Sequence, residues 1–590
     1  MMSSTGIAAP AAASYWAPPR ASREAIENLQ RDLQWERPAA AVLAERGYLD
    51  PEAAREFLYP RLESLHDPLL MRDMERAVAR TLDAVRGGER ILLYGDYDAD
   101  GTCSIVILKK CLDLLGGQAD FHVPHRIKDG YGMRAEVVEQ AAHDGVRLIV
   151  SADTGIRAAD VVRQGNALGI DTIVTDHHLP EAELPPALAV LNPNRPDCTY
   201  PNKHLCGAGV AFKLVQALLA ASGFAEARRH ALLESFLKLV AIATVADVVP
   251  LKGENRILVQ RGLCGLRKVR NPGLQALLAT AGFADGECPS AHAVAFRVAP
   301  RINAAGRMAT AQDVVELFLT KDTKRARELA EQLDALNRER QEVERRIVET
   351  IVEGCEESPR EGTAFVFAGA DWHLGVLGIV ASRLVERLYR PVFVLSDTTS
   401  EAGEPMLAGS GRSIPSFHLL EALESMPEVF SRFGGHRQAA GVTLVAERLG
   451  EFRNRFEQYA CERLRPDDLC RRHAIDAAVS FAELSERAIQ QVMMLGPFGM
   501  GNPAPLFCAQ GAEVAGPPKA LQDGKHFDVP LRHGGRLLFC KAWHFAERAA
   551  LLAPGSKLDV LFQIEDDAFS RKRGYGSWCI SIKDVRACTV

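Results

Sequence analysis

Short apolar runs that end next to acidic or histidine residues recur in the first half of this chain, separated by segments with helical periodicity. Three of them cover Ile91–Gly95, Leu148–Ser151 and Thr172–Thr175, and a further apolar run covers Leu188–Leu191. Strand, helix and strand at this spacing form βαβ units, which build a parallel sheet. Ligands of such open sheets bind beyond the carboxyl ends of the strands. The pattern therefore predicts an α/β domain with its chemistry at one edge of the sheet.

The densest acidic group of the chain follows the first of these runs. Asp96, Asp98 and Asp100 stand at every second position, so on an extended segment all three would share one side. Carboxylates this close raise one another's pKa values unless a cation neutralises them. Taken alone, the group also fits a solvated acidic turn. An EF-hand is disfavoured, because no Glu stands at the twelfth position and the surroundings are βαβ.

The ends of later apolar segments carry further groups of the same kind. These are Asp153, then Asp176, His177 and His178 together, and Asp247 at the end of an apolar helix that begins at Phe236. The predicted sheet brings such residues to one crevice. Oxygen ligands with one or two imidazoles suit Mn²⁺ or Mg²⁺ better than a closed zinc site. Enough carboxylates for two ions, one of them bridging, is the arrangement that hydrolyses phosphate esters.

These segments resemble the four motifs of the DHH phosphoesterase superfamily. They are Asp96-Tyr97-Asp98-Ala99-Asp100-Gly101, Asp153-Thr154-Gly155, Asp176-His177-His178 and Ala246-Asp247. The resemblance continues in Arg301-Ile302-Asn303-Ala304-Ala305-Gly306-Arg307, Gly409-Ser410-Gly411-Arg412-Ser413 and Gly434-Gly435-His436. Seven segments in this order, spread over nearly the whole chain beyond about residue 30, are similar to the RecJ family of bacterial 5′→3′ exonucleases specific for single-stranded DNA.

The resemblance implies a role for each residue of the predicted centre. Asp98 and Asp153 would hold one metal ion, with Asp153 bridging, and Asp100, His177 and Asp247 would complete the second. His178 would lie next to the reacting phosphate, which makes Asp153 and His178 the catalytic pair, and Asp176 would orient the imidazoles. Many superfamily members have a His where this chain has Tyr94. Asp96 is the candidate substitute ligand.

The resemblance also indicates contacts to DNA. Arg301 and Arg307 flank a run of small residues that we expect to be a loop, where two guanidiniums could clamp a phosphate; surface ion pairs are the alternative. Ser410 and Arg412 lie in a Gly-rich segment whose backbone N–H groups would suit an oxyanion, and His436 ends a similar segment. For both segments a purely structural turn is the alternative.

Composition and periodicity, together with what the resemblance implies, divide the chain into five parts. A tail and helical segment covers residues 1–85, and a DHH catalytic domain with a parallel sheet covers 86–320. Residues 321–358 are expected to form a long linker helix between two domains, with a dimerising coiled coil as the alternative. A second α/β domain of the DHHA1 type covers 359–465. Five short β-rich runs in 466–590 are typical of a small OB-like barrel.

Aromatic and basic residues of the C-terminal part are further candidates for DNA contact. The aromatic residues, which could stack bases or simply fill the barrel, are Phe527, Phe539, Trp543, Phe545 and Trp578. A Gly-flanked hairpin with Arg571-Lys572-Arg573 could meet phosphates. Arg126 and Tyr131, between two motifs, either line a channel or belong to a structural turn.

Composition excludes several classes of protein. The chain has 590 residues and a formal net charge of −6, so a strongly basic coat for nucleic acid is excluded and attraction must be local. Its longest apolar stretches are about half as long as a bilayer span, and residues 1–22 lack the features of a signal peptide. The thirteen cysteines contain no CxxC pair. We therefore expect a cytoplasmic protein with reduced thiols and no membrane contact.

The function that the resemblance implies is hydrolysis of single-stranded DNA from its 5′ end, in DNA repair and recombination. Two Mn²⁺ or Mg²⁺ ions would be the cofactors, and a single-strand-binding protein and a helicase are candidate partners. One alternative is a DHH phosphodiesterase for short oligonucleotides or cyclic dinucleotides. Another is a replication scaffold that has lost its metal ligands, although here all four motifs are filled.

Overall fold

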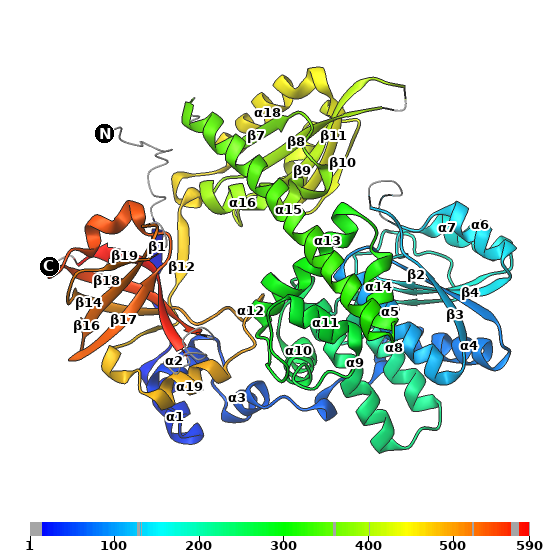
Figure 1. The fold of residues 1–590 in the computed structure, drawn as a ribbon, viewed down its shortest axis with the longest axis horizontal. Helices are drawn as coiled ribbons and strands as arrows, with labels where there is room; N and C mark the ends of the chain where they lie inside the picture. Colours follow the sequence, from blue (N-terminus) through cyan, green and yellow to red (C-terminus); the bar gives the residue numbers. More distant parts are fainter. Residues whose placement is uncertain are drawn as a thin grey trace.

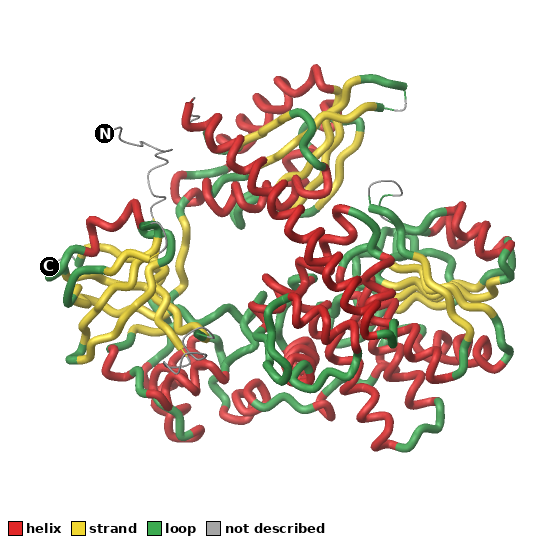
Figure 2. The backbone as a smooth tube through the Cα atoms, viewed as in Figure 1, coloured by secondary structure: helices red, strands yellow, loops and turns green. Residues whose placement is uncertain are grey.

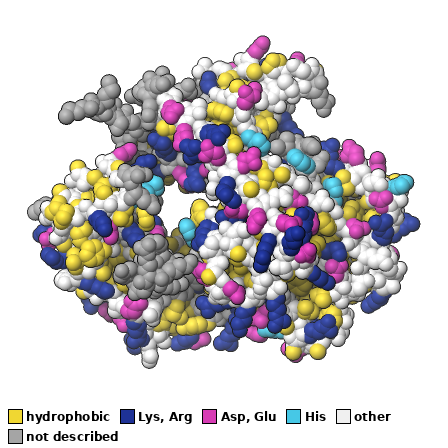
Figure 3. All heavy atoms as spheres, viewed as in Figure 1, with side chains coloured by type: hydrophobic (Ala, Val, Ile, Leu, Met, Phe, Trp, Pro, Cys, Tyr) yellow, Lys and Arg dark blue, Asp and Glu magenta, His cyan; other side chains and the backbone are white. Residues whose placement is uncertain are grey.

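The computed structural model describes residues 14–126, 130, 132–357, 362–400, 402–521, 524–567 and 578–588. Three lobes surround a central opening (Figure 1), which persists when all atoms are drawn as spheres (Figure 3). The first lobe is residues 62–320, the second is 362–469, and the third combines 14–58 with 471–588. Among the described residues, no helix is both long and apolar enough to cross a membrane.

The first lobe contains the predicted parallel sheet, with strand order β3-β2-β4-β5-β6. The strands are β2 (Arg90–Gly95), β3 (Gln118–His122), β4 (Val146–Ala152), β5 (Asp171–Thr175) and β6 (Ala189–Leu191). All four pairings are parallel, so the strands end at one edge. The sequence did not indicate β3, because this edge strand is short and only partly buried.

Helices cover the sheet and form a helical half of this lobe beside the opening (Figures 1 and 2). They are α4 (Met74–Arg86), α5 (Ala99–Leu115), α6 (Ala135–His143), α7 (Ala159–Ala167), α8 (Gly207–Ala221), α9 (Glu226–Ala246), α10 (Gly253–Gly265), α11 (Pro272–Thr280), α12 (Ala291–Ala293), α13 (Ala299–Met308) and α14 (Gln312–Leu319). A π-helical turn, Val294–Val298, joins α12 to α13.

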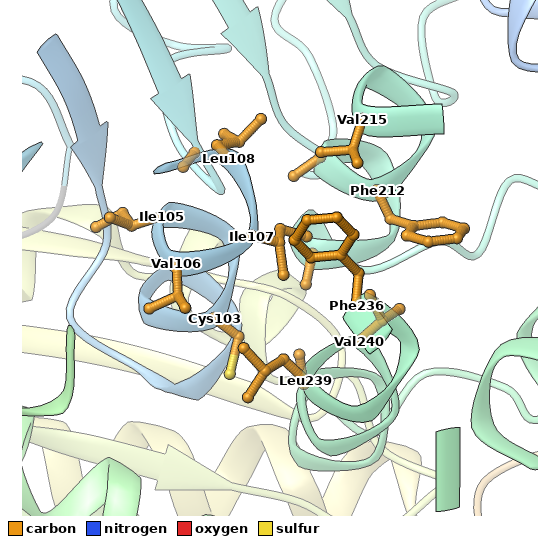
Figure 4. Packing of buried hydrophobic residues seen from close by; sticks show 14 of the residues in the cluster. Cys103, Ile105, Val106, Ile107, Leu108, Phe212, Val215, Phe236, Leu239 and Val240 are labelled. Carbon is orange, nitrogen blue, oxygen red and sulfur yellow. The ribbon is translucent and has the colours of Figure 1, made fainter. Parts of the chain in front are cut away.

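The core of the first lobe is built where α5, α8 and α9 meet. Figure 4 shows Ile107 of α5 facing Phe212 and Val215 of α8 and Phe236 and Val240 of α9, all of which are buried. A helix that is apolar on all sides must be buried, and this describes most of α5 and α8. Helix α5, which begins within the acidic motif, is thus held in place by buried contacts with α8 and α9.

Helix α15 (Thr323–Glu357) links the first two lobes, as predicted. Leu329 and Leu333 belong to the core of the first lobe, while Ile347 and Ile351 pack with residues of the second. Arg340, which interrupts the apolar stripe, is buried between the two groups and donates to Glu344 at 3.1 Å. Both ends of the helix are therefore anchored in hydrophobic cores.

The second lobe is a five-stranded sheet in the order β10-β11-β9-β8-β7. Its strands are β7 (Phe365–Gly369), β8 (Val392–Thr399), β9 (Pro405–Arg412), β10 (Arg432–Gly435) and β11 (Ala439–Val445), and its helices are α16 (Leu377–Leu388), α17 (Leu419–Glu424) and α18 (Leu449–Arg463). Only β7 and β8 pair in parallel. The predicted strands and helix around residues 364–395 are present.

The third lobe contains the predicted five-stranded barrel. Its strands are β14 (Phe507–Val514), β16 (His526–His533), β17 (Arg536–Ala542), β18 (Lys557–Asp566) and β19 (Trp578–Ala587), with β13 (Ala477–Ala478) and β15 (Lys519–Leu521) added at the edges and α19 (Glu486–Met494) beside it. Strand β14 pairs with both β18 and β16. This double pairing closes the sheet, as in an OB fold.

The N-terminal segment packs on this barrel and not on the lobe that follows it in sequence. Strand β1 (Ser14–Ala17) pairs with β12 (Arg471–Ala474), and α1 (Arg23–Leu33), α2 (Arg37–Glu45) and α3 (Pro51–Leu58) precede the first lobe. Leu29 and Val42 share a hydrophobic core with Phe507 and Phe562. The two ends of the chain therefore form one unit.

Candidate metal centre

The predicted acidic and histidine residues meet at the carboxyl edge of the first sheet. Three sets lie close enough to share an ion, with potential ligand atoms within 4.8 Å of one another: Asp96, Asp98 and Asp153; Asp100, His177 and Asp247; and Asp153, His177 and His178. Asp153 and His177 belong to two sets each. The sets therefore form one continuous centre rather than separate sites.

The loop after β2 places its carboxylates differently from the extended segment that we predicted. Asp98 caps α5, and its Oδ1 accepts from the N–H groups of Asp100 at 2.9 Å and Gly101 at 3.1 Å. Asp100 therefore already lies in the helix and faces a different set from Asp96 and Asp98. A Cβ atom at Gly101 would lie 2.7 Å from the backbone of Asp96, so this tight turn requires glycine.

Asp153 lies at the middle of the centre. It is 2% exposed, and His177 Nε2 is 3.3 Å from its Oδ1. Its backbone is left-handed, with φ +64°, and its N–H donates to the Thr175 carbonyl at the end of β5, at 2.9 Å. Burial and the charges of Asp100 and other carboxylates raise the pKa of Asp153 well above its usual range.

The second set has both anionic and neutral members. Asp100 accepts from the N–H groups of Gly207 and Ala208, at 2.5 and 2.7 Å, at the start of α8. Burial, and then the charge of Asp98, raise its pKa to about 6. Burial and the neighbouring His178 lower the pKa of His177 to about 4. His177 is therefore a neutral imidazole at pH 7, the form that binds a metal.

Asp176 belongs to none of the three sets, and its carboxylate contacts the neighbouring imidazole of His178. Its Oδ1 lies 2.8 Å from His178 Nδ1, and its two oxygens also accept N–H groups of His177, His178 and Ile156. Burial alone would lower the pKa of His178, but the hydrogen bond and charge of Asp176 raise it overall. The ring is fixed with its other nitrogen directed away from Asp176.

The residues of the centre fit a metal ion. Within the described part of the chain, Asp96 Oδ1, Asp153 Oδ1 and Asp247 Oδ2 are buried and have no hydrogen-bond partner. Buried polar atoms normally have a partner, and the same carboxyl groups have raised pKa values from burial and mutual repulsion. Divalent cations bound by these oxygens would remove both costs.

Three family profiles match the chain in the order of the three lobes. They are "DHH family, N-terminal domain" over residues 90–244, "DHHA1 domain" over 361–462 and "RecJ OB domain" over 475–576. The single-stranded-DNA-specific exonuclease RecJ of Bacillus subtilis is 36% identical over 558 residues, which are 95% of this chain and 69% of that protein. This chain belongs to the RecJ family.

Other RecJ proteins agree with this assignment. The Escherichia coli enzyme is 40% identical over 449 residues, 74% of this chain and 77% of its own. A crystal structure of RecJ from Thermus thermophilus in complex with Mn²⁺ matches with a TM-score of 0.82 at 30% identity, over 98% of this chain and 80% of that chain. A Mg²⁺ complex of the same protein matches with a TM-score of 0.76 at 29% identity, over 98% of this chain and 79% of that chain.

Guanidinium groups from a turn, from α13 and from β9 gather beside the acidic loop. Arg126 lies over the ring of Tyr97 at 4.9 Å. Burial, and then repulsion from Arg126 and other arginines, lower the pKa of Arg307 to about 10, and burial followed by Arg126 also lowers that of Arg412. Mutually repelling cations next to a metal centre suit a polyanionic ligand. Tyr131 lies outside the described residues.

The surroundings of Arg307 correct one prediction. The small residues between Arg301 and Arg307 form helix α13, not a loop. Asn303 Oδ1 accepts from the Ala99 N–H at 2.7 Å, and a Cβ atom at Gly306 would clash with the backbone of Tyr97. The small residues let the helix pack directly on the acidic loop.

Arg301 points away from the other arginines. Its guanidinium donates to the carbonyl groups of Arg297 and Thr280 and pairs with Asp334 at 2.8 Å. These partners, two in the first lobe and one in α15, occupy both terminal nitrogens. The structure thus brings Arg307 to the centre but not Arg301.

The segments that we predicted as Gly-rich turns in the second lobe are strands. Ser410 lies in β9, where it is paired with Val394 on one side and Gly441 on the other, so the backbone of β9 is engaged in the sheet. Arg412 at the end of β9 reaches Gly378 of α16. Burial, then Arg157 and His178, lower the pKa of His436. The prediction of free backbone N–H groups is therefore wrong for β9, but the side chains of Arg412 and His436 interact with charged groups of the first lobe.

A groove crosses this face of the second sheet. It has a volume of about 460 Å³, and its lining includes Leu374, Ser410, Arg432, Gly434 and Gly441. The bottom of the groove is formed by glycine and serine residues of neighbouring strands, whose small side chains leave it open. Leu374 lines the groove, and Arg307 donates to the carbonyl of the next residue, Gly375, at 3.0 Å. The groove therefore lies close to Arg307.

The barrel aromatics divide into two groups. Phe545 is buried, and Phe527 and Trp578 pack against the core. Phe539 is 65% exposed and Trp543 is 39% exposed, and Lys541 Nζ lies 6.0 Å from the Trp543 ring. Arg571-Lys572-Arg573 lie outside the described residues. Of the five candidates, Phe539 and Trp543 therefore have the exposure that stacking requires.

Proposed function

We propose that this chain is a metal-dependent exonuclease that removes nucleotides from the 5′ end of single-stranded DNA by hydrolysis of phosphodiester bonds, in DNA repair and recombination. The observation that carries the proposal is the continuous acidic centre, with three buried carboxylate oxygens that lack partners among the described residues. Membership of the RecJ family, whose relatives are named single-stranded-DNA-specific exonucleases, supports the substrate.

The ligands divide between two sites that share Asp153. Asp96 and Asp98 would hold one ion, and Asp100, His177 and Asp247 the other. Carboxylate oxygens with a single neutral imidazole suit Mn²⁺ or Mg²⁺, the ions present in the Thermus thermophilus RecJ structures. Two bound ions supply Lewis acidity and a nucleophilic water at neutral pH.

The remaining polar residues hold the strand. His178, fixed by Asp176, would in its protonated form donate a hydrogen bond from its second ring nitrogen to a phosphate oxygen. Arg307 and Arg412, with Ser410 and His436 on the opposite lobe, would bind the terminal 5′ phosphate through charge-assisted bonds. Positioning of the phosphate in line for attack is what such clamps contribute to the rate.

The rest of the molecule favours a long polymer over a small substrate. The lobes surround an opening (Figures 1 and 3), and the barrel presents exposed Phe539 and Trp543 beside Lys541. A dinucleotide would require neither feature. A scaffold without activity would be expected to lack ligands, whereas all four motifs of this chain keep their acidic and histidine residues.

Release of nucleotides from end-labelled strands tests the proposal. With Mn²⁺, a 5′-labelled single strand should lose its label as a mononucleotide at once, while a 3′-labelled strand should shorten progressively. Chelator should stop both reactions, and a blunt duplex should be spared. Hydrolysis restricted to dinucleotides would contradict the proposal and favour the small-substrate alternative.

We further propose the cellular setting and the domain limits given above. A single-strand-binding protein and a helicase are the proposed partners, because a duplex must be opened before a single-strand enzyme can act. A cytoplasmic location is supported by the thirteen free cysteines. The proposed limits are 1–85, 86–320, 321–358, 359–465 and 466–590, and residues 14–58 of the first segment pack on the last.

A further inference from the structure

The residue directly after the ligand Asp247 has an unusual backbone and an unusual environment. Val248 has φ +57°, a left-handed conformation that is a genuine outlier for a β-branched residue. Its side chain is 65% exposed, although Val is normally a core residue. Strain of this kind persists only where the surroundings impose it, and it concentrates at functional sites.

Two anchors impose this conformation. On one side, Asp247 ends α9 with its N–H bonded to the Ala243 carbonyl at 2.9 Å. On the other, Leu251 is 2% exposed, and its N–H donates to the Met500 carbonyl of the third lobe at 2.7 Å. Val248 thus lies between two fixed points, one at the metal centre and one at the barrel lobe.

The loop that carries Met500 fits closely against this segment. A Cβ atom at Gly499 would lie 2.8 Å from the Leu251 side chain, and one at Gly501, which has φ +72°, would lie 3.1 Å from Pro250. Both glycines are therefore small because the two lobes touch here.

Asn502 fixes the shape of the same loop. Its Nδ2 donates to the carbonyl groups of Leu495 and Pro497, at 3.0 and 2.9 Å, and its Oδ1 accepts from Arg46 at 2.6 Å. Contacts from the N-terminal segment and the barrel lobe therefore fix the loop that contacts the segment after Val248.

We propose that Val248 contacts the substrate: its side chain packs on the nucleotide next to the phosphodiester at the metal centre, and the Gly499–Asn502 loop keeps it in place. The inference rests on the proposed function, since the occupant is the single strand that this function places there. Val248 directly follows Asp247, so a strand bound at the metal centre would lie next to it. The exposed valine side chain can neither bind a metal nor transfer a proton, so it can offer the strand only an apolar contact. Val248 is a positioning residue for the nucleotide.

Val248→Gly in the full-length chain tests this. Glycine tolerates left-handed backbone, so the melting temperature should stay equal or rise, while KM for single strands should rise about fivefold, the effect of losing part of one apolar contact. Mn²⁺ affinity, measured by calorimetry, should not change, and Val248→Ile should keep KM low. Gln34→Gly, another left-handed position, at the end of α1, is the matched control and should leave KM unaltered.

Strands with one abasic site at each of the first four positions locate the contact. At one position the wild-type KM should rise to that of Val248→Gly, and the variant should show no further loss. Asn502→Ala, which loosens the loop, should raise KM in the same way. Weaker Mn²⁺ binding by Val248→Gly, or equal KM values on every strand, would overturn the inference. Absence of nucleotide release by the wild type would instead overturn the proposed function.

Discussion

Two groups of charged side chains are buried in the first lobe, and they differ in how completely they are paired. Lys213 and Glu254 are fully buried and 3.1 Å apart. Glu254 also accepts from the Tyr200 hydroxyl at 2.9 Å, and Lys213 donates to the His66 carbonyl at 2.6 Å. In the metal centre the carboxylates face one another, and three of their oxygens have no hydrogen-bond partner within the described residues.

The difference separates a structural role from a functional one. A paired network contributes to one defined fold, and removing one partner leaves a buried charge that costs several kcal/mol. Mutual repulsion within a group of like charges lowers the stability of the metal-free protein, so such a group is kept for what it binds. Substitutions in the two groups should therefore have opposite effects on stability and activity.

The largest expected effect is that of Asp153→Ala on activity. The variant loses the carboxylate shared by the two proposed sites, so nucleotide release from single strands should be abolished even at saturating Mn²⁺. The melting temperature of the metal-free variant should rise, because one of several repelling charges is gone. Full activity in this variant would exclude the bridging role.

Glu254→Ala should have the reverse effect. It leaves the Lys213 ammonium buried and unpaired, at a cost of ~3–5 kcal/mol in the free energy of unfolding, which urea denaturation would measure. The activity of the fraction that remains folded should change little. Lys213→Met combined with Glu254→Leu should recover much of the stability, and failure to do so would show that the network matters beyond its charges.

Arg412→Ala should weaken binding of 5′-phosphorylated strands by ~1.5–3 kcal/mol, the range for hydrogen bonds to charged groups. Strands with a 5′ hydroxyl should lose less, because a terminal phosphate carries more charge than a diester. Fluorescence anisotropy with chelator present separates binding from cleavage. Equal losses on both strands would reduce Arg412 to a general backbone contact.

Arg301→Ala is the matched comparison for that variant. Because Arg301 bonds to groups on its own side of the molecule, its removal should lower the free energy of unfolding by ~1–3 kcal/mol and leave DNA affinity unchanged. A loss of affinity for 5′-phosphorylated strands would return Arg301 to the phosphate site that the sequence suggested.

The smallest effect expected is a graded response to salt. Each phosphate contact on a single strand should lower the logarithm of the binding constant by ~0.7 per tenfold increase in salt. Arg412→Ala should reduce the slope by about one contact. A flat response in the wild type would mean that stacking dominates, and Phe539 and Trp543 would then become the primary sites.

The sequence predicted that these acidic and histidine residues lie together, because the topology of the parallel sheet brings most of them to one edge. Residues after parallel strands must meet at one edge, so Asp153 and His177 could be placed together without knowledge of any packing. The prediction failed for Asp98 and Asp100 only in local geometry, because the helix begins at Ala99 and turns the second carboxylate away from the first.

The sequence predicted the local structure around the arginines poorly, because a run of small residues fits either a loop or a closely packed helix or strand. Around Gly306 we expected a loop and around Gly411 a Gly-rich segment with backbone N–H groups for an oxyanion, but the first lies in helix α13 and the second in strand β9. A Cβ atom at Gly411 would lie 2.5 Å from the Phe393 ring. Such residues are small because a neighbour touches them, and only the tertiary structure shows the neighbour.

The packing of the N-terminal helices on the barrel also could not be predicted from patterns within the sequence of either segment. Leu29 and Phe507 share one core, yet nothing within either segment identifies its partner. Periodicity predicts which face of a segment is buried, but not which distant segment covers that face.

Counting bound Mn²⁺ by equilibrium dialysis tests the central claim most directly. The wild-type chain should bind two ions per chain, and Asp153→Ala should bind at most one with reduced affinity, since it removes the shared ligand. Wild-type chains that bind no ion, or an Asp153→Ala variant that still binds two with unchanged affinity, would contradict the account.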